Sequence, residues 1–189
     1  MKQSILLLCI GIWFLQSCSS SKKSTGTKPT EIADIKSTVV IKNKVPPVKI
    51  DVKNVKPDEL VAFAETLKGV PYLYGSMKTE NGFDCSGFVN YVFNHFGIKV
   101  PRTTVGFTNA GKEVSLHESK EGDIVLFTGS DAKSGVVGHM GIIVEHKKND
   151  FEFIHSASGK ASGVMISNMN SYFIPRFVKV IRVFPAIEN

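Results

Sequence analysis

Helical spacing of apolar residues comes first in this chain and strand-like runs follow, and this order restricts the fold more than any other feature. A first helix is predicted to begin at Pro57, because proline suits the first helical turn, and to end before Gly69. A second is predicted after Asp84, a good N-cap residue, and ends at Gly97. Strand-like runs then occupy residues 123–127, 139–146, 151–155, 163–167 and 178–184. Helices followed by sequential strands predict an α+β fold, with the helices packed on an antiparallel sheet.

The N-terminal residues predict export and a lipid anchor. Eleven residues, Ile5–Leu15, form an apolar run that is too short to span a bilayer but suits a signal peptide. The following Gln-Ser-Cys18 resembles a bacterial lipobox, in which Cys18 is lipidated and becomes the mature N-terminus. An ordinary signal peptide with an incidental cysteine is the alternative. The predicted organisation is a lipoprotein signal peptide (1–17), a lipidated cysteine with a basic tether or extended arm (18–56), and a catalytic domain (57–189).

The formal net charge of +6 does not indicate a nucleic-acid-binding protein. Residues 19–57 carry nine lysines and three acidic residues, whereas residues 58–189 carry 13 basic and 14 acidic residues. A nucleic-acid module carries its basic surface on the folded domain, so we expect no nucleic-acid partner. The basic tether suits anionic lipid or wall polymer, or else serves as a solvated spacer.

Cysteine usage leaves one thiol in the mature domain. Cys9 leaves with the signal peptide and Cys18 carries the lipid, so only Cys85 remains and no disulfide framework is possible. Cys85 is predicted in the first turn of the second helix, where the helix dipole and free backbone N–H groups lower a cysteine pKa from about 8.5 toward neutrality. This placement indicates a nucleophile, with a buried structural cysteine as the alternative.

Two of the five histidines occupy the far ends of neighbouring strands. In a hairpin, the residue numbers of every directly opposed pair add up to the same value, which describes the register. If this sum is even and near 294–296, His139 and His155 lie on the same face of the hairpin; if it is odd, they lie on opposite faces. In the even register one imidazole can take the thiol proton while the other orients it. Two unrelated surface histidines, or a zinc site made with Cys85, are the alternatives.

Six segments, in order, resemble the NlpC/P60 cysteine peptidases of bacterial cell walls. They are Gly69–Gly75, Phe83–Val89, Val100–Thr104, Gly122–Phe127, Gly138–Val144 and Phe153–Ala157. The following tail, Ser162–Asn170, is most similar to the lipoprotein murein endopeptidases of that family. The resemblance implies a reduced papain-like α+β domain with the nucleophilic cysteine at a helix N-terminus.

By this resemblance Cys85 is the nucleophile, His139 the general base, His155 the orienting residue and Tyr72 a hydroxyl that helps the oxyanion. Asp84, Ser86 and Arg102 are candidate substrate-binding residues. Asp84 is also a helix cap, and Arg102, which could meet a substrate carboxylate, is also the kind of residue that is simply solvated.

The resulting hypothesis is a cysteine endopeptidase that cuts peptidoglycan stem peptides through a thioester acyl-enzyme, with no metal or organic cofactor. The bond is either the cross-link between a diamino acid and D-Ala or the bond between D-Glu and the diamino acid. A non-catalytic peptidoglycan-binding lipoprotein of the same fold is the alternative. The predicted location is the cell envelope, lipid-anchored in the outer membrane and facing the periplasm, with any regulatory protein unknown.

Overall fold

The computed structural model describes residues 48–147, 150–159 and 162–185. These residues belong to one compact unit, residues 31–189; the other unit, residues 1–30, lies outside the described ranges, as do Cys18 and the predicted signal peptide. Within the described ranges, no helix combines the length and the apolar character that a membrane crossing requires.

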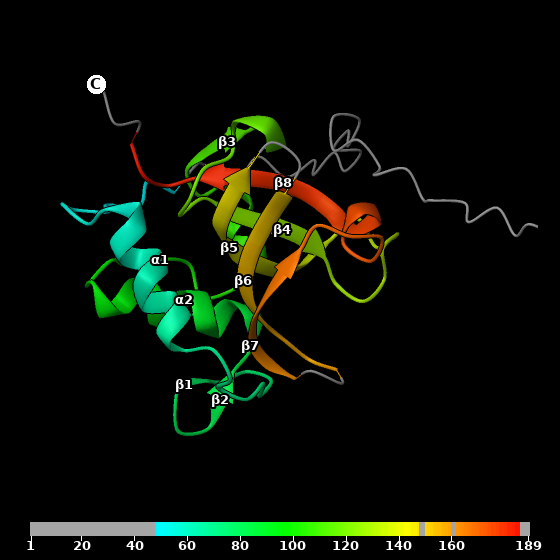
Figure 1. Cartoon of the computed structure of the whole chain (residues 1–189), viewed down its shortest axis with the longest axis horizontal. Helices are drawn as coiled ribbons and strands as arrows, with labels where there is room; N and C mark the ends of the chain where they lie inside the picture. The colour runs from blue at the N-terminus through cyan, green and yellow to red at the C-terminus, as the bar shows by residue number, and fades with distance from the viewer. Residues whose placement is uncertain (1–47, 148–149, 160–161, 186–189) are drawn as a thin grey trace, which may run out of the picture. The chain divides into compact units, whose positions relative to one another are not determined.

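Both predicted helices form where the sequence indicates. Helix α1 spans Pro57–Thr66 with proline in its first turn, and α2 spans Cys85–His95 with Asp84 as its N-cap. Glycines with left-handed backbone, Gly69 and Gly97, follow the two helices. The helices contact each other, and α2 packs against the sheet strands β5 and β6 (Figure 1).

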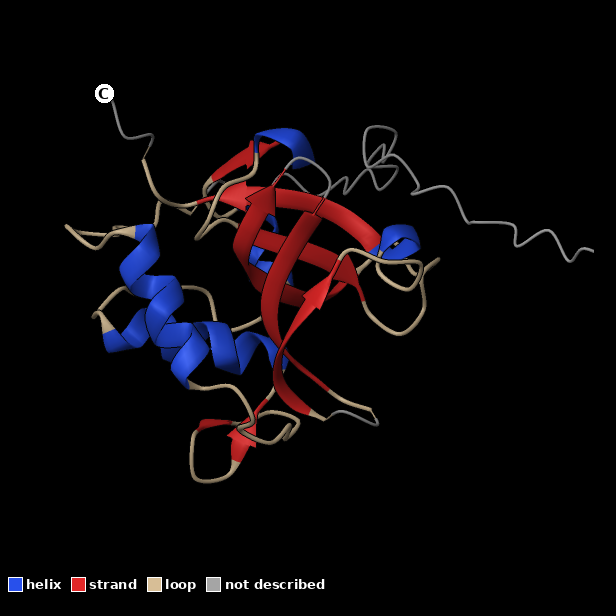
Figure 2. Cartoon of the chain, viewed as in Figure 1, coloured by secondary structure: helices blue, strands red, loops and turns tan. Residues whose placement is uncertain are grey.

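A six-stranded antiparallel sheet is the largest element of the described domain (Figure 2). Its strands lie in the order β3 (Lys112–Val114), β8 (Phe177–Arg182), β4 (Ile124–Thr128), β5 (Val137–Lys147), β6 (Asp150–Ala157) and β7 (Gly163–Asn168). Five of these strands match the predicted runs, and β3 was not predicted. A small hairpin of β1 (Met77–Lys78) and β2 (Gly82–Phe83) precedes α2. Short 3-10 helices lie at Val105–Asn109, Leu116–Glu118 and Ile174–Arg176.

The sheet buries apolar side chains on both faces. On β4, Ile124 and Leu126 belong to the core that contains the helices, whereas Val125 and Phe127 belong to a second core. This is the alternation expected of a strand covered on both sides. The second core is rich in aromatic rings, including Phe153 and Phe173.

The start of the described region packs on the domain. Ile50 and Val52 are 6% and 7% exposed and belong to the core around the helices. Val48 forms an isolated bridge with Ala110. The last part of the predicted tether therefore lies against the domain as an extended arm.

A bulge in the β5–β6 hairpin sets the register on which the histidines depend. Next to the turn, Lys147 pairs with Asp150, and the paired numbers add up to an odd value. The register shifts between Ile143 and Glu145, so that further from the turn Ile142 pairs with Ile154 and the sum is 296. Val144 is the extra residue. The even register predicted as one alternative is therefore present around His139 and His155.

Replacing Gly87 by alanine tests the close approach of α2 to the segment before β1. Alanine favours a helix over glycine by about 1 kcal/mol, but a Cβ at Gly87 would overlap the carbonyl oxygen of Ser76. We expect Gly87→Ala to lower the free energy of unfolding in urea by about 1–3 kcal/mol. Gly129→Ala is the control, since its nearest contact would be Gly138 Cα at 3.7 Å. A Gly87→Ala protein as stable as the wild type would contradict this packing.

Candidate active site

Cys85 begins α2, as predicted, and its thiol lies beside the sheet. The Asp84 carboxylate caps the helix by accepting a hydrogen bond from the Gly87 N–H. Cys85 is 9% exposed, and its Sγ lies 3.8 Å from the carbonyl oxygen of Gly138. The residue after Gly138 is His139, so the chain path brings the predicted nucleophile and the predicted base to one place.

The two histidines form a direct hydrogen bond. Gly141 is opposite His155 in the register that continues from the Ile142–Ile154 pair, so His139 is diagonal to His155 on the same face. His139 Nε2 lies 2.8 Å from His155 Nδ1. Because this bond uses Nε2 of His139, its Nδ1 is the nitrogen that remains for a thiol.

Ser167 extends this arrangement and was missed by the sequence analysis. His155 is opposite Met165 on β7, so Ser167, two residues further, lies on the same face as His155. The hydroxyl of Ser167 lies 2.9 Å from His155 Nε2. Strand alternation would have indicated Ser167 only if the β6–β7 register had been known.

Aromatic rings surround the histidine pair and keep it neutral. Phe173 lies near both imidazoles, with ring centroids 6.4 Å from His139 and 5.6 Å from His155, and Phe153 lies 4.9 Å from His155. Burial lowers the pKa of His139 to about 4. Burial, followed by the charge of His139, lowers the pKa of His155 to about 3.

The predicted lowering of the Cys85 pKa is wrong. Burial, followed by the negative charge of Asp84, raises the pKa of the Cys85 thiol to about 11. Hydrogen bonds from the backbone of Ser86, Cys85 and Met140 act in the expected direction and are outweighed. The helix N-terminus thus favours the thiolate as expected, but exclusion of water favours the thiol more strongly. At neutral pH the cleft is lined by a neutral thiol and two neutral imidazoles.

Tyr72 reaches the site through a local pairing with the strand before α2. The N–H of Phe83 donates to the carbonyl of Pro71 at 2.9 Å, and the N–H of Leu73 donates to the carbonyl of Phe83 at 3.1 Å. Burial, and then the charges of Cys85 and Asp84, raise the pKa of Tyr72. Its hydroxyl therefore stays protonated at neutral pH, as a hydrogen-bond donor to an oxyanion must.

Asp84, Ser86 and Arg102 contact one another. Arg102 Nη2 lies 3.0 Å from the Asp84 carboxylate, and Arg102 Nη1 donates to the Ser86 hydroxyl at 2.9 Å. Arg102 Nη2 also donates to the carbonyl of Gly75 at 3.1 Å. This network joins the Tyr72 segment to the start of α2. Arg102 is therefore paired, and the predicted substrate contacts of the three residues stay a prediction.

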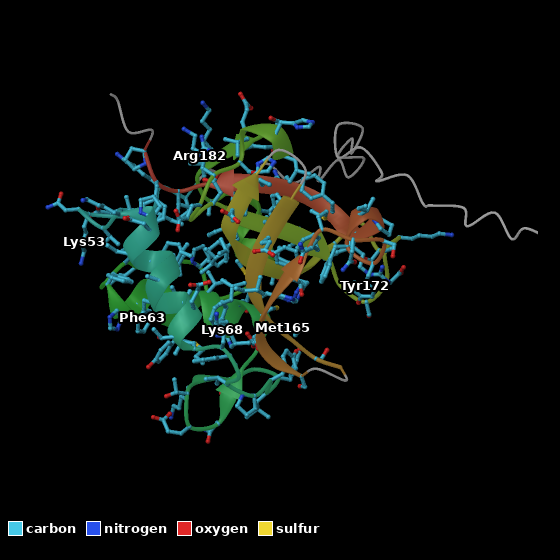
Figure 3. The ribbon with its side chains drawn as sticks, in the orientation of Figure 1. Lys53, Phe63, Lys68, Met165, Tyr172 and Arg182 are labelled. Carbon is cyan, nitrogen blue, oxygen red and sulfur yellow. The ribbon has the colours of Figure 1, made fainter. Side chains whose placement is uncertain are left out.

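A cleft of about 520 Å³ opens above the histidine pair, and its lining includes Tyr72, Cys85, His139, His155 and Ser167. Three further lining residues that the sequence analysis did not single out are Met165, Tyr172 and Arg176. In Figure 3, Met165 lies on β7 and Tyr172 on the connection that follows.

Arg176 connects two of the segments that line this cleft. Its guanidinium stacks 3.9 Å from the Tyr172 ring centroid and donates to the carbonyls of Tyr172 and Ser130. These contacts hold the connection before β8 against the one between β4 and β5.

The geometry does not support a zinc site made from Cys85 and the two histidines. Among the described residues, no three His, Cys, Asp or Glu side chains are arranged to hold a metal ion. The direct 2.8 Å contact between His139 Nε2 and His155 Nδ1 is that of two imidazoles that share a proton, whereas ligands of one ion would both direct a lone pair at it.

Comparison with known proteins gives consistent matches over the described domain. A sequence profile of the NlpC/P60 family matches residues 69–182. Murein DD-endopeptidase MepS/Murein LD-carboxypeptidase of Escherichia coli (strain K12) is 39% identical over 119 residues, covering 61% of this chain and 57% of that protein. A probable endopeptidase of Haemophilus influenzae is 35% identical over 117 residues, covering 61% of this chain and 67% of the relative. The chain thus matches little more than half the length of the Escherichia coli relative.

Solved structures share the fold. The crystal structure of an NlpC/P60 family protein from Bacillus cereus is 25% identical and superposes with a TM-score of 0.63, covering 71% of this chain and 42% of that chain. The α+β architecture predicted from the order of helices and strands is confirmed.

The raised pKa of Cys85 predicts how its reactivity changes with pH. The thiolate is the reactive form, so alkylation of Cys85 by iodoacetamide should accelerate about tenfold per pH unit from pH 7 to 10, toward its pKa of about 11. In the urea-denatured chain the same rate should level off above about pH 9. Mass spectrometry of the Cys85 peptide gives the rate, with the Cys85→Ala protein as the blank. A native rate that is level between pH 5 and 8 would instead indicate a thiolate–imidazolium pair.

Proposed function

This chain belongs to the NlpC/P60 family, and from this premise we propose that it is a cysteine endopeptidase that hydrolyses peptide bonds of peptidoglycan. The observation that carries the proposal is the arrangement of Cys85, His139 and His155 around one cleft, with the two imidazoles 2.8 Å apart. A nucleophile, a base and a group that orients the base are the parts that amide hydrolysis through an acyl-enzyme requires. A cell-envelope location follows from this substrate.

Acylation begins with a neutral thiol and a neutral imidazole. As Cys85 Sγ attacks the amide carbonyl carbon, His139 Nδ1 takes the thiol proton, and the carbonyl oxygen becomes an oxyanion. The backbone N–H of Cys85, at the start of α2, and the Tyr72 hydroxyl are the donors proposed to stabilise that oxyanion. When the tetrahedral intermediate collapses, His139 gives its proton to the leaving amine, and a thioester remains.

Deacylation repeats these steps with water. His139 Nδ1 takes a proton from water as the oxygen attacks the thioester, and returns it to the leaving thiolate of Cys85. His155 Nδ1 lies 2.8 Å from His139 Nε2. In this mechanism it accepts the Nε2–H of His139 in both half-reactions and stabilises the imidazolium that forms transiently. Since burial lowers the pKa of His139 to about 4, the imidazolium is a strong acid and readily gives its proton to the leaving group.

The proposed substrate is a stem peptide of peptidoglycan. The name of the Escherichia coli relative includes a DD-endopeptidase activity, which supports a cut in the cross-link between a diamino acid and D-Ala. Asp84, Ser86 and Arg102 are proposed to act on the side of the cleft next to α2. Because each is already paired within the network, we propose that Arg102, the most exposed of the three, exchanges its Gly75 contact for a substrate carboxylate.

The lipid anchor is part of the proposal. The Gln-Ser-Cys18 sequence after the apolar leader supports lipidation of Cys18, and Ser19 is compatible with sorting to the outer membrane. In this arrangement the anchor and the basic tether keep the catalytic domain within reach of the wall from the periplasmic side.

Digestion of purified sacculi tests the enzymatic activity. The full-length protein in detergent is expected to convert cross-linked muropeptide dimers into intact monomers, measured by mass spectrometry, and Cys85→Ala should lose activity by about 1,000-fold or more. Shortened stems that end at D-Glu would instead place the cut between D-Glu and the diamino acid. Full turnover by Cys85→Ala would contradict the mechanism, and tight binding to sacculi without cleavage by either protein would favour a peptidoglycan-binding role.

The anchor is tested by the mass of the mature protein. We expect an N-terminal peptide that begins at Cys18 and carries acyl chains. Several acyl chains would hold the protein at the membrane, because each buried CH₂ adds about 0.8 kcal/mol of membrane affinity. A Cys18→Ala protein should lack this mass and lose its membrane association. A free, unacylated N-terminus downstream of position 18 in the wild type would contradict lipidation.

A further inference from the structure

The series of hydrogen bonds that begins at His139 ends at Ser167 and not at His155. His139 Nε2 lies 2.8 Å from His155 Nδ1, and His155 Nε2 lies 2.9 Å from the Ser167 hydroxyl. His155 is 1% exposed, so neither of its ring nitrogens can rely on bulk water for a partner. The direction in which protons are donated along this series decides whether His139 can act as a base.

Two arrangements of protons satisfy the two contacts. In the first, His139 Nε2–H donates to His155 Nδ1, and His155 Nε2–H donates to the Ser167 oxygen. A neutral imidazole carries one N–H, so His139 Nδ1 is then an unprotonated lone pair. This arrangement provides the base that the proposed reaction needs at the thiol of Cys85.

In the second arrangement every bond is reversed. The Ser167 hydroxyl donates to His155 Nε2, and His155 Nδ1–H donates to His139 Nε2. The proton of His139 is then on Nδ1, which faces away from His155 and cannot accept the thiol proton. The same heavy-atom distances are therefore compatible with an active and an inactive tautomer.

We propose that Ser167 is a positioning residue that, by accepting the Nε2–H of His155, selects the tautomer in which His139 Nδ1 is free to act as the base. This inference rests on the proposed function of the same site. The imidazolium stage needs the same direction, because a doubly protonated His139 must donate through Nε2 to His155 Nδ1. The Nε2–H of His155 then again requires an acceptor.

The position of Ser167 suits an acceptor. Its hydroxyl lies on a partly exposed residue that lines the cleft, so its own proton can turn toward solvent while its oxygen faces His155. The imidazole of His155 is enclosed by the rings of Phe153 and Phe173, which offer no acceptor. Without the Ser167 oxygen, a buried N–H would be left without a partner, which proteins avoid more strictly than an unused lone pair. Loss of the hydroxyl therefore favours the inactive tautomer.

Nitrogen-15 NMR of the histidine rings at neutral pH tests the tautomers without any substrate. In the wild type we expect both His139 and His155 to carry the proton on Nε2. In Ser167→Ala a substantial fraction of both rings should carry it on Nδ1. Ser156→Ala is the matched control, because it removes a serine hydroxyl from the neighbouring strand β6 that donates to the carbonyl of Phe83 at 2.8 Å and not to an imidazole. It should lower stability and leave both tautomers unchanged.

Kinetics on a cross-linked muropeptide gives the second measurement. A wrong tautomer removes the base and leaves the cleft intact, so Ser167→Ala should reduce kcat by about 10-fold to 100-fold and change KM by less than about threefold. Ser167→Thr keeps the hydroxyl and should restore kcat to within about threefold of the wild type.

The outcomes separate this inference from the proposed function. A wild type in which His139 carries its proton on Nδ1, or a Ser167→Ala protein that keeps both tautomers and full kcat, would overturn the role of Ser167. If Ser167→Ala fails to fold, the wild-type tautomers and the Ser167→Thr rescue still decide. A wild type that shows the expected tautomers but cleaves no muropeptide would contradict the proposed function and leave the role of Ser167 in the histidine pair intact.

Discussion

The pairing of β5 with β6 is the constraint on which the rest of the site depends. Side chains alternate between the faces of a sheet, so a shift of one residue would move one imidazole of the pair to the opposite face. If the register next to the turn continued along the whole hairpin, His139 and His155 would lie on opposite faces of the sheet. The extra residue Val144 shifts the register by one residue, so that both histidines lie on the same face. An extra residue on β5 that contacts neither imidazole thus makes the 2.8 Å contact of the two histidines possible.

The aromatic surroundings of this pair determine what kind of chemistry it can perform. Phe173 lies near both imidazoles and Phe153 near that of His155, and burial lowers both histidine pKa values while it raises that of Cys85. An ion pair in the resting state is disfavoured on both sides by the same exclusion of water. The charge separation that a neutral pair avoids at rest must then develop during attack on the substrate. In the proposed mechanism the Cys85 N–H and the Tyr72 hydroxyl stabilise the negative charge, and His155 Nδ1 stabilises the positive one.

The elements of this fold could largely be predicted from the sequence, whereas their relative placement could not. Helix caps such as Asp84 and apolar periodicity are local signals, and both helices and five strands of the sheet follow from them. The bulge at Val144 and the β6–β7 register that brings Ser167 to His155 depend on pairing between segments, so the sequence left the first as two alternatives and did not indicate the second. The direction of the Cys85 pKa shift was wrongly predicted for the same reason. The effect of the helix dipole follows from the local sequence, whereas burial of the thiol depends on segments that are distant in the sequence.

Catalysis in this arrangement requires a fixed spacing between two parts of the domain. One part contains Tyr72 and Cys85 at the start of α2, and the other is the sheet, which carries the histidines. Backbone hydrogen bonds from Phe83 to Pro71 and from Leu73 to Phe83 hold the Tyr72 segment next to the residues that lead into α2, so Tyr72 and Cys85 keep their relative positions. The histidines belong to the sheet, and their series of hydrogen bonds ends at Ser167.

Two hydrogen bonds link the two parts. The Ser156 hydroxyl donates to the carbonyl of Phe83 at 2.8 Å, and the Thr104 hydroxyl donates to the carbonyl of Val137 at 3.1 Å. Both bonds lie within two residues of a catalytic candidate, since Phe83 precedes Cys85 and Val137 precedes His139. These polar contacts at the ends of the elements, one buried and one partly buried, add to the apolar packing of α2 on the sheet in fixing the positions of Cys85 and His139.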